Sequence, residues 1–168
     1  MSLSIRRLGA EDAPAYRTLR LEALSRHPEA FGAAYDEEAL HPLAWTEERL
    51  AGNVVLGGVS GGDGRLVGTA GLSVPAGLKM RHRGVLWGMY VSPQARRTGV
   101  GTALVQALVS EANSRVEEVT LTVASGNEPA LTLYRRAGFI EYGQDLRALK
   151  LEGDRYVDET LMRRRLRR

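Results

Sequence analysis

The sequence predicts an α/β domain with a mixed β-sheet of six to seven strands, flanked by about four helices. Apolar residues recur at helical spacing between residues 99 and 115, and they alternate with polar ones between residues 119 and 123. Residues 85–91 form an almost continuous apolar run, as expected of a central strand covered on both faces. Strand and helix signals follow the order β-α-α-β-β-β-α-β-α-β-β, which is typical of an α/β domain.

The first part of the chain is expected to form a strand and two helices. Ser4–Leu8 predicts a short strand, and an acidic turn with Pro14 starts a helix that His27-Pro28 ends. Residues 31–50 are less regular, and we expect a loop and a second helix that His41-Pro42 interrupts. The residues at helical spacing in the first helix are Tyr16, Leu19, Arg20, Ala23 and Leu24.

From residue 53 the pattern changes to strands. Val54–Val59 and Arg65–Val74 flank Ser60–Gly64, whose glycines and aspartate are a strong hairpin signal. A looser loop, residues 75–83, then leads to the buried strand Gly84–Val91.

The second half of the chain has the clearest signals. Gly99–Arg115 predicts an amphipathic helix, and Val119–Val123 predicts a β-branched strand. Asn127-Glu128-Pro129 provides a cap and an opening for another helix, and Gly138 before Phe139 is a Schellman-type stop. The last two strands are expected near Leu146–Leu151 and Tyr156–Leu166.

The composition is that of an ordinary globular protein. The chain has 168 residues, of which 43% are hydrophobic and 26% charged, so we expect one domain over residues 1–168. No apolar run approaches the roughly 18 residues of a membrane span, and the N-terminus lacks a signal-peptide core. We therefore expect a cytoplasmic protein with no membrane partner. The absence of cysteine excludes disulfides, thiolate metal sites and a cysteine nucleophile, and no metal-ligand spacing appears.

The net charge of +3 is a property of the C-terminus. Arg163, Arg164, Arg165, Arg167 and Arg168 form a terminal run, and without these five the charge would be 3 − 5 = −2. We expect this run to be a solvated strand end, and we expect no nucleic-acid partner.

The segment between the buried strand and the clearest helix is suited to bind an anion. It reads Arg96-Arg97-Thr98-Gly99-Val100-Gly101-Thr102. The first turn of a helix has N–H groups without internal partners, and the helix dipole adds positive charge there. Glycines at 99 and 101 let the backbone approach a diphosphate, and the arginines supply suitable donors. The segment therefore predicts a phosphate-binding loop.

Two other glycine-rich signatures fit this segment less well. A P-loop needs Gly-Lys-Ser/Thr, but Thr102 follows Gly101 directly. A Rossmann fingerprint needs a third glycine and an acid after the next strand, which here ends Ala124-Ser125-Gly126-Asn127. Glycines that only tighten a turn are the remaining alternative, which the flanking strand, arginines and helix disfavour.

The segment resembles the cofactor motif of the Gcn5-related N-acetyltransferase (GNAT) superfamily, Gln/Arg-x-x-Gly-x-Gly/Ala, at Arg96–Gly101. The preceding Met89–Pro93 is similar to the family's splayed fourth strand, and a second family block matches at Asn127–Phe139. The element order also matches over nearly the whole chain. The resemblance implies a GNAT-like fold with acetyl-CoA as the acetyl donor and no metal.

The resemblance also implies which residues hold the cofactor. Backbone groups of Met89 and Val91 would bond the pantetheine arm and polarise the thioester carbonyl, and the amides of residues 97–102 would hold the pyrophosphate. Asn127 would contact the cofactor as well as cap a helix, and Ala130 would line the arm. The full predicted set is Met89, Tyr90, Val91, Arg96, Arg97, Thr98, Gly99, Val100, Gly101, Thr102, Asn127, Ala130 and Tyr134.

The resemblance makes Tyr134 the general acid that protonates the leaving thiolate. A phenol with a pKa near 10 is adequate, because the CoA thiol is a better leaving group than an alkoxide. The residue pattern by itself favours a core aromatic beside Leu131.

The base that would deprotonate the amine is not evident. Many family members place a glutamate on the fourth strand, but no carboxylate lies between Gly84 and Val91. Asp36, Glu37 and Glu38 lie in the connection between the first two helices, and we take Glu37 as a candidate base or amine contact. A solvated helix start explains the same acidic run. Weaker candidates are Asp158, Glu159 and His82.

These observations predict an acetyl-CoA-dependent N-acetyltransferase that acts on a primary amine by direct attack in a ternary complex. Without cysteine, no thiol can carry a covalent acetyl group. The acceptor is expected to be a small-molecule amine or a peptide amine, and the protein a monomer or homodimer. Glu141–Asp145 lacks the Arg-x-x-Tyr-Tyr stretch of the family's ribosomal-protein acetylating branch. The alternative is a catalytically weak acyl-CoA-binding sensor, which only the missing strand-four carboxylate supports.

Overall fold

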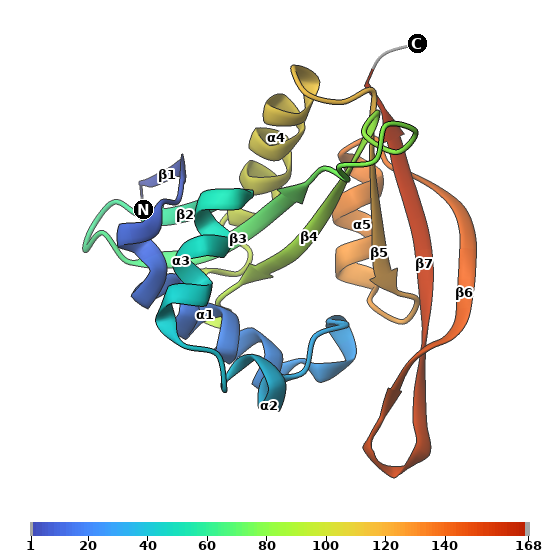
Figure 1. Cartoon of the computed structure of the whole chain (residues 1–168), viewed down its shortest axis with the longest axis horizontal. Helices are drawn as coiled ribbons and strands as arrows, with labels where there is room; N and C mark the ends of the chain where they lie inside the picture. The colour runs from blue at the N-terminus through green and yellow to red at the C-terminus, as the bar shows by residue number, and fades with distance from the viewer. Residues whose placement is uncertain (1, 167–168) are drawn as a thin grey trace.

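The computed structural model describes residues 2–166, which form a seven-stranded mixed sheet covered by helices (Figure 1). The strand order across the sheet is β1-β2-β3-β4-β5-β7-β6, and only the β4–β5 pair is parallel. The strands are β1 (Leu3–Arg7), β2 (Val54–Ser60), β3 (Leu66–Ser73), β4 (Arg83–Val91), β5 (Glu118–Ala124), β6 (Ile140–Leu151) and β7 (Arg155–Arg165). The α-helices are α1 (Ala13–Arg26), α2 (Tyr35–Glu38), α3 (Leu43–Gly52), α4 (Val100–Asn113) and α5 (Glu128–Arg136). The predicted fold class is confirmed.

The helices form a layer on each face of the sheet. On one face, α4 and α5 bury Leu104, Leu108 and Leu131 against β2 to β5, in the larger apolar cluster. On the other face, α1 and α3 bury Tyr16 and Leu50 against β2. Both layers use the apolar stripes that the sequence predicts for α1 and α4.

The predicted helix boundaries are largely confirmed. Residues 31–50 hold the one-turn helix α2 and then α3, and Pro42 is the N-cap of α3, so the interruption at His41-Pro42 is real. The end of α5 is the expected Schellman motif. Gly138 has φ +90°, and the amides of Phe139 and Gly138 donate to the carbonyls of Tyr134 and Arg135 at 3.0 Å.

The strand expected at Leu146–Leu151 is too short, because β6 begins at Ile140. It is an edge strand without a single buried residue, so its first half shows no apolar alternation. Its register with β7 shifts twice, at Glu141/Gly143 and Asp145/Leu149, and Arg147 has φ +55° in the second irregularity. The β6–β7 hairpin extends beyond the rest of the sheet (Figure 1).

The expectation of a solvated C-terminal arginine run is wrong for its first part. Arg163 and Arg164 are half-buried residues of β7. Arg164 Nη1 donates to the Ala137 carbonyl at 2.7 Å, and Arg163 lies 5.2 Å from the ring centre of Tyr142. Residues 167 and 168 of the run lie outside the described residues. None of the helices in residues 2–166 is long and apolar enough to cross a membrane.

The sheet opens between β4 and β5. Parallel pairing joins Arg83, Gly84 and Val85 to residues 118–120 and then stops. Beyond these pairs the two strands diverge (Figure 1). The carboxyl ends of both strands therefore stand apart, with α4 and α5 beginning beside them.

Candidate functional site

The opening between β4 and β5 holds a large cavity, here called the outer cavity, with a volume of about 1040 Å³. The end of β4, the loop before α4, the end of β5 and the start of α5 form its walls. Eleven residues of the predicted cofactor set line it, namely Met89, Tyr90, Val91, Arg96, Arg97, Gly99, Val100, Gly101, Thr102, Asn127 and Ala130. Thr98 lies between two of them in the chain, and Tyr134 lines the neighbouring space described below.

The loop before α4 offers a row of free backbone donors. In the described part of the chain, the amides of residues 97–102 donate to no carbonyl or side chain. Arg97 has φ +61° and Gly99 has φ +87°, and left-handed residues in such a loop turn successive N–H groups toward a common point. The N-terminus of α4 adds its partial positive charge. The loop can therefore hold a phosphate group by its backbone.

The outer cavity fits a ligand that is anionic at one end and less polar along its length. Beyond the loop, its walls include the apolar side chains of Met89, Ala130 and Leu133. A Cβ added at Gly101 would lie 3.4 Å from Leu133 Cδ2, so a side chain here would fill the space between the loop and α5. A diphosphate followed by an extended arm, as in coenzyme A, matches both parts of the cavity.

Three predicted residues make side-chain hydrogen bonds within the protein itself. Arg96 Nε donates to the Val91 carbonyl at 3.2 Å, and its Nη2 lies 3.1 Å from His27 Nε2. Arg96 therefore ties the loop to the end of β4. Tyr90 points its hydroxyl to Glu22 on α1 at 2.9 Å. Asn127 has the predicted capping role, because its Oδ1 accepts from the Ala130 amide at 3.2 Å.

A smaller space, here called the inner cavity, adjoins the outer one and has a volume of about 230 Å³. Met89, Asn127 and Ala130 are among the residues that line both cavities. The inner cavity is lined further by polar or aromatic side chains from five elements, namely Arg20, Phe31, Trp87, Thr122, Tyr134 and Glu159. Two joined cavities of this kind can hold a long donor and a small acceptor side by side.

Tyr134 lines the inner cavity from α5. Its side chain is 5% exposed, and its ring packs edge-on against Phe139 with the ring centres 5.9 Å apart. Burial raises the pKa of the Tyr134 phenol well above its ordinary value, so the hydroxyl stays protonated at neutral pH. Tyr134 is therefore a core aromatic that also lines the inner cavity.

Glu159 lines the same cavity from β7. Its pKa is raised, first by burial and then by the charge of Asp145, against the opposing effect of a hydrogen bond with Thr122. A carboxylate whose pKa is raised toward neutrality is better suited to accept a proton than an ordinary surface glutamate.

The other acids proposed from the sequence lie elsewhere. Glu37 is exposed on α2 and lines neither cavity, and the same is true of Asp36. Asp158 lines the outer cavity, and it accepts a hydrogen bond from the Arg147 amide at 2.8 Å. His82 is exposed in the loop before β4, away from both cavities.

Arg20 was not predicted as a site residue, although it lies on the apolar stripe of α1. A charged residue at a buried helical position was the available signal. Its side chain is 8% exposed, and it makes two hydrogen bonds to Glu38, at 3.1 and 2.9 Å. Arg49 on α3 contacts the same carboxylate at 3.3 Å. Burial raises the pKa of Glu38, but the two arginines outweigh it and lower the pKa overall.

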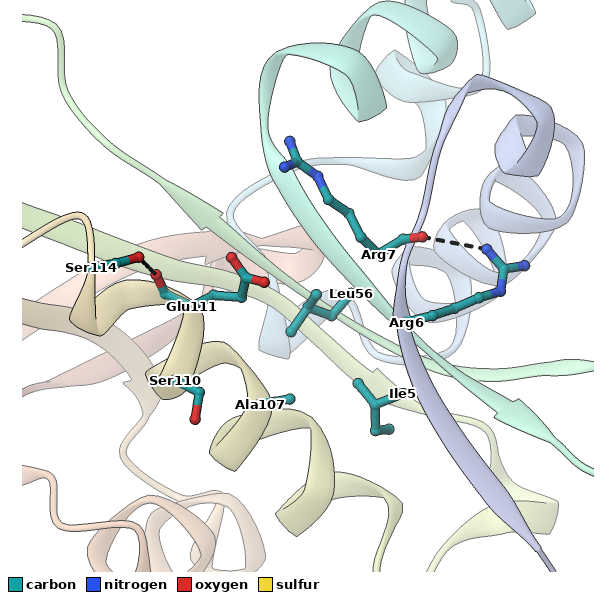
Figure 2. Close-up of a pocket in the computed structure, with 8 residues that line it drawn as sticks. All are labelled: Ile5, Arg6, Arg7, Leu56, Ala107, Ser110, Glu111 and Ser114. Atoms are coloured by element: carbon teal, nitrogen blue, oxygen red, sulfur yellow. Dashed lines mark hydrogen bonds between the residues drawn. The ribbon is translucent and has the colours of Figure 1, made fainter.

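A third cavity, of about 480 Å³, lies between β1 and α4 (Figure 2). Two of its three charged groups are paired, since Arg6 contacts Asp12 at 2.8 Å and Glu111 contacts Arg115 at 3.3 Å, and Arg7 Nη2 donates to the Asn53 carbonyl at 3.4 Å. Figure 2 shows the Arg6 side chain extending away from α4. Among residues 2–166 there is no group of three or more His, Cys, Asp or Glu side chains that could hold a metal ion.

Comparison with known proteins gives the family. The sequence pattern of the acetyltransferase (GNAT) family matches residues 16–139, from α1 to the end of α5. The chain belongs to the GNAT family. This confirms the resemblance found in the sequence, and the matched region contains both predicted motifs.

The chain is also similar to individual acetyltransferases and shares its fold with solved structures. The chain is 30% identical over 148 residues to the mycothiol acetyltransferase of Clavibacter michiganensis, which covers 86% of this chain and 44% of that protein. It thus spans less than half the length of this relative. A GNAT acetyltransferase structure from Streptococcus pneumoniae superposes with a TM-score of 0.85 at 21% identity, over 98% of this chain and 99% of the other. A Salmonella typhimurium structure with acetyl-CoA superposes with a TM-score of 0.82 at 23% identity, over 100% of this chain and 96% of the other.

Proposed function

We propose that this protein transfers acetyl from acetyl-CoA to a primary amine by direct attack in a ternary complex. The observation that carries the proposal is the pair of joined cavities, one with a row of free amides and the other with a buried phenol and a carboxylate. The GNAT relatives named above include acetyltransferases and a structure with acetyl-CoA. The proposed acceptor is a small-molecule amine or a peptide amine.

The outer cavity would hold the cofactor, which supplies an activated thioester. The amides of residues 97–102 would donate to the pyrophosphate, and Arg97 would add charge beside it. Backbone groups of Met89 and Val91 on the free edge of β4 would orient the arm. This edge is available because pairing with β5 ends at Val85. The side chain of Ala130 would line the same arm.

Tyr134 is the proposed general acid. It would donate its phenolic proton to the departing thiolate. The phenol is protonated at neutral pH, because its pKa lies above neutrality both in water and in this buried position. Tyr134 lines the inner cavity together with Asn127 and Ala130, which line the outer cavity as well, and this supports the role.

Glu159 is the proposed base that accepts a proton from the attacking amine. It replaces the strand-four glutamate that the sequence lacks, and it approaches the junction from β7 instead. Glu159 is favoured over Glu37, the earlier candidate, because Glu159 lines the inner cavity and Glu37 is exposed outside it. A carboxylate here can also attract the ammonium form of the acceptor before deprotonation.

An acceptor screen tests the proposal. Purified protein is incubated with acetyl-CoA and a panel of primary amines, and free CoA thiol is followed by a chromogenic reagent. We expect steady thiol release with at least one amine, and intersecting double-reciprocal lines when both substrates are varied. Parallel lines would instead indicate a covalent acetyl-enzyme. Tight acetyl-CoA binding without turnover on any amine would favour the alternative of an acyl-CoA sensor.

A further inference from the structure

Arg20, which lines the inner cavity, shares its carboxylate partner with a second arginine. Arg20 and Arg49 share one carboxylate, that of Glu38, so the cluster of these three side chains carries a net charge of +1, with Arg49 as its partly exposed member. Glu38 and Arg20 are each 8% exposed. A buried guanidinium that shares its one carboxylate with a second arginine is only partly neutralised, so this cluster favours the arrival of an anion.

The free donor of this cluster faces the cavity. Arg20 Nε and Nη2 are bound to Glu38, while Nη1 has no hydrogen-bond partner among the described residues. Nη1 is directed toward β4, since a Cβ added at Gly88 would lie 3.5 Å from it. Arg20 and Gly88 both line the inner cavity. Arg49, by contrast, does not line it.

The guanidinium is held rigidly in this position. Its Cζ lies 5.4 Å from the ring centre of Phe31 and 5.8 Å from that of Trp87. The two bonds to Glu38 fix its plane. A donor that is immobilised before the ligand arrives costs little conformational entropy on binding.

The inner cavity therefore has two poles. The cationic pole is Arg20 Nη1 on the α1 side, and the acidic pole is Glu159 on β7. Its volume of about 230 Å³ admits only a small group. An amine that also carries a negative charge matches both poles, whereas a polyamine would place a second cation next to Arg20.

We propose that the acceptor is a small amino-acid-like molecule, whose carboxylate or similar anion is bound by Arg20 Nη1 while its amine faces Glu159. This inference rests on the proposed acetyl transfer and gives the substrate class of that site. An arginine N–H bonded to a carboxylate is a charge-assisted hydrogen bond. A bond of that strength corresponds to a preference of about 10- to 100-fold over an uncharged analogue.

The test compares the twenty common L-amino acids with their α-amides as acceptors. The amides keep the amine and side chain but remove the α-carboxylate. Asn and Gln, set against Asp and Glu, test a side-chain carboxylate in the same way. We expect kcat/KM for thiol release to be at least about 10-fold higher for the acceptor that has the carboxylate bound by Arg20 than for its amide. This carboxylate is either the α-carboxylate or the side-chain carboxylate.

The variant Arg20→Lys is the main probe. Lysine can keep the charge pair with Glu38 but lacks the second terminal nitrogen, so the preference for the anionic acceptor should fall to about 1. Arg49→Lys is the matched control, because it changes the other contact to Glu38 without touching the cavity, and it should keep the preference. If Arg20→Lys does not fold, Arg20→Met/Glu38→Gln removes both partners together and should show the same loss.

Binding separates this inference from the proposed reaction. The same amino acids and amides are titrated by calorimetry into protein saturated with CoA. Tighter binding of the anionic members to the wild type, and loss of this difference in Arg20→Lys, would support the inference. This holds even if no acceptor turns over, and in that case only the proposed acetyl transfer fails. Equal binding and equal turnover of amino acids and amides would overturn the inference and leave the acetyl transfer intact.

Discussion

Asp145 on β6 lies directly opposite Glu159 on β7 in the antiparallel ladder, so two carboxylates occupy neighbouring positions on the hairpin. Glu159 lines the inner cavity, and Asp145 does not. Burial is the main cause of the raised pKa of Glu159, and the charge of Asp145 adds to it. Asp145 thus acts through Glu159, because its negative charge makes the Glu159 carboxyl group hold a proton more tightly.

Asp145→Asn should move the acid limb of the kcat/KM profile to lower pH. Removing the neighbouring charge lowers the pKa of Glu159, so its basic form is present at more acidic pH.

The raised pKa of Glu159 also affects stability. The folded state loses stability as the pH rises from the ordinary pKa of a glutamate through the raised pKa of Glu159. Asp145→Asn should lessen that loss, as seen by denaturation at pH 4 and pH 8.

The control for this change is Asp154→Asn, at the turn of the same hairpin. Asp154 has φ +54°, which asparagine also adopts readily, and it pairs with Lys150 rather than with Glu159. The pH profile of kcat/KM for Asp154→Asn should match that of the wild type. Equal shifts in both variants would mean that a general charge effect, and not the Asp145–Glu159 pair, sets the acid limb.

Glu159→Gln should lower kcat/KM by about 10²-fold or more near neutral pH, the usual range for a positioned base. Glutamine is close in size, so acetyl-CoA affinity measured by calorimetry should stay unchanged. The rate of the variant should rise with pH as more of the amine is already deprotonated in solution. Glu37→Gln is the matched comparison, and a larger loss in that variant would return the role of base to α2.

Tyr134→Phe should lower kcat by about 10²-fold or more while the melting temperature changes little. Phenylalanine keeps the edge-on contact with Phe139 and the buried ring, and it removes only the proton donor. Tyr142→Phe, at an exposed tyrosine of β6, provides the control. If Tyr134→Phe retains the wild-type rate, Tyr134 serves only in the core.

Much of this architecture follows from local sequence signals. Gly138 ends α5 and Pro42 starts α3 because each residue has strong local conformational preferences, so one sequence suffices to place them. The first half of β6 could not be found in this way, since an edge strand exposed along its length has no apolar period. Strand pairing, which is not local, decides its extent.

The same distinction applies to the site. The loop at residues 96–102 is contiguous, and its glycines and arginines reveal its chemistry directly. The inner cavity brings together Arg20, Tyr134 and Glu159, which are separated by more than a hundred positions at the extremes. No spacing rule connects such residues. Glu37 belongs to a run of three acids, and the run alone does not show that its neighbour Glu38 is the carboxylate that turns inward to Arg20.

Gly101→Asp should weaken acetyl-CoA binding by at least about 10-fold, which corresponds to about 1.4 kcal/mol. Position 101 is in the first turn of α4, where an aspartate is favourable to the helix, and the added Cβ would meet only the flexible end of Leu133 at 3.4 Å. The fold should therefore remain intact, while the carboxylate repels phosphate from the free amides. Gly101→Asn has nearly the same shape without the charge, so the difference between the two variants isolates electrostatics. That difference should shrink as salt is raised in calorimetric titrations. Equal affinities for the two variants at low salt would mean that the phosphates lie away from this loop.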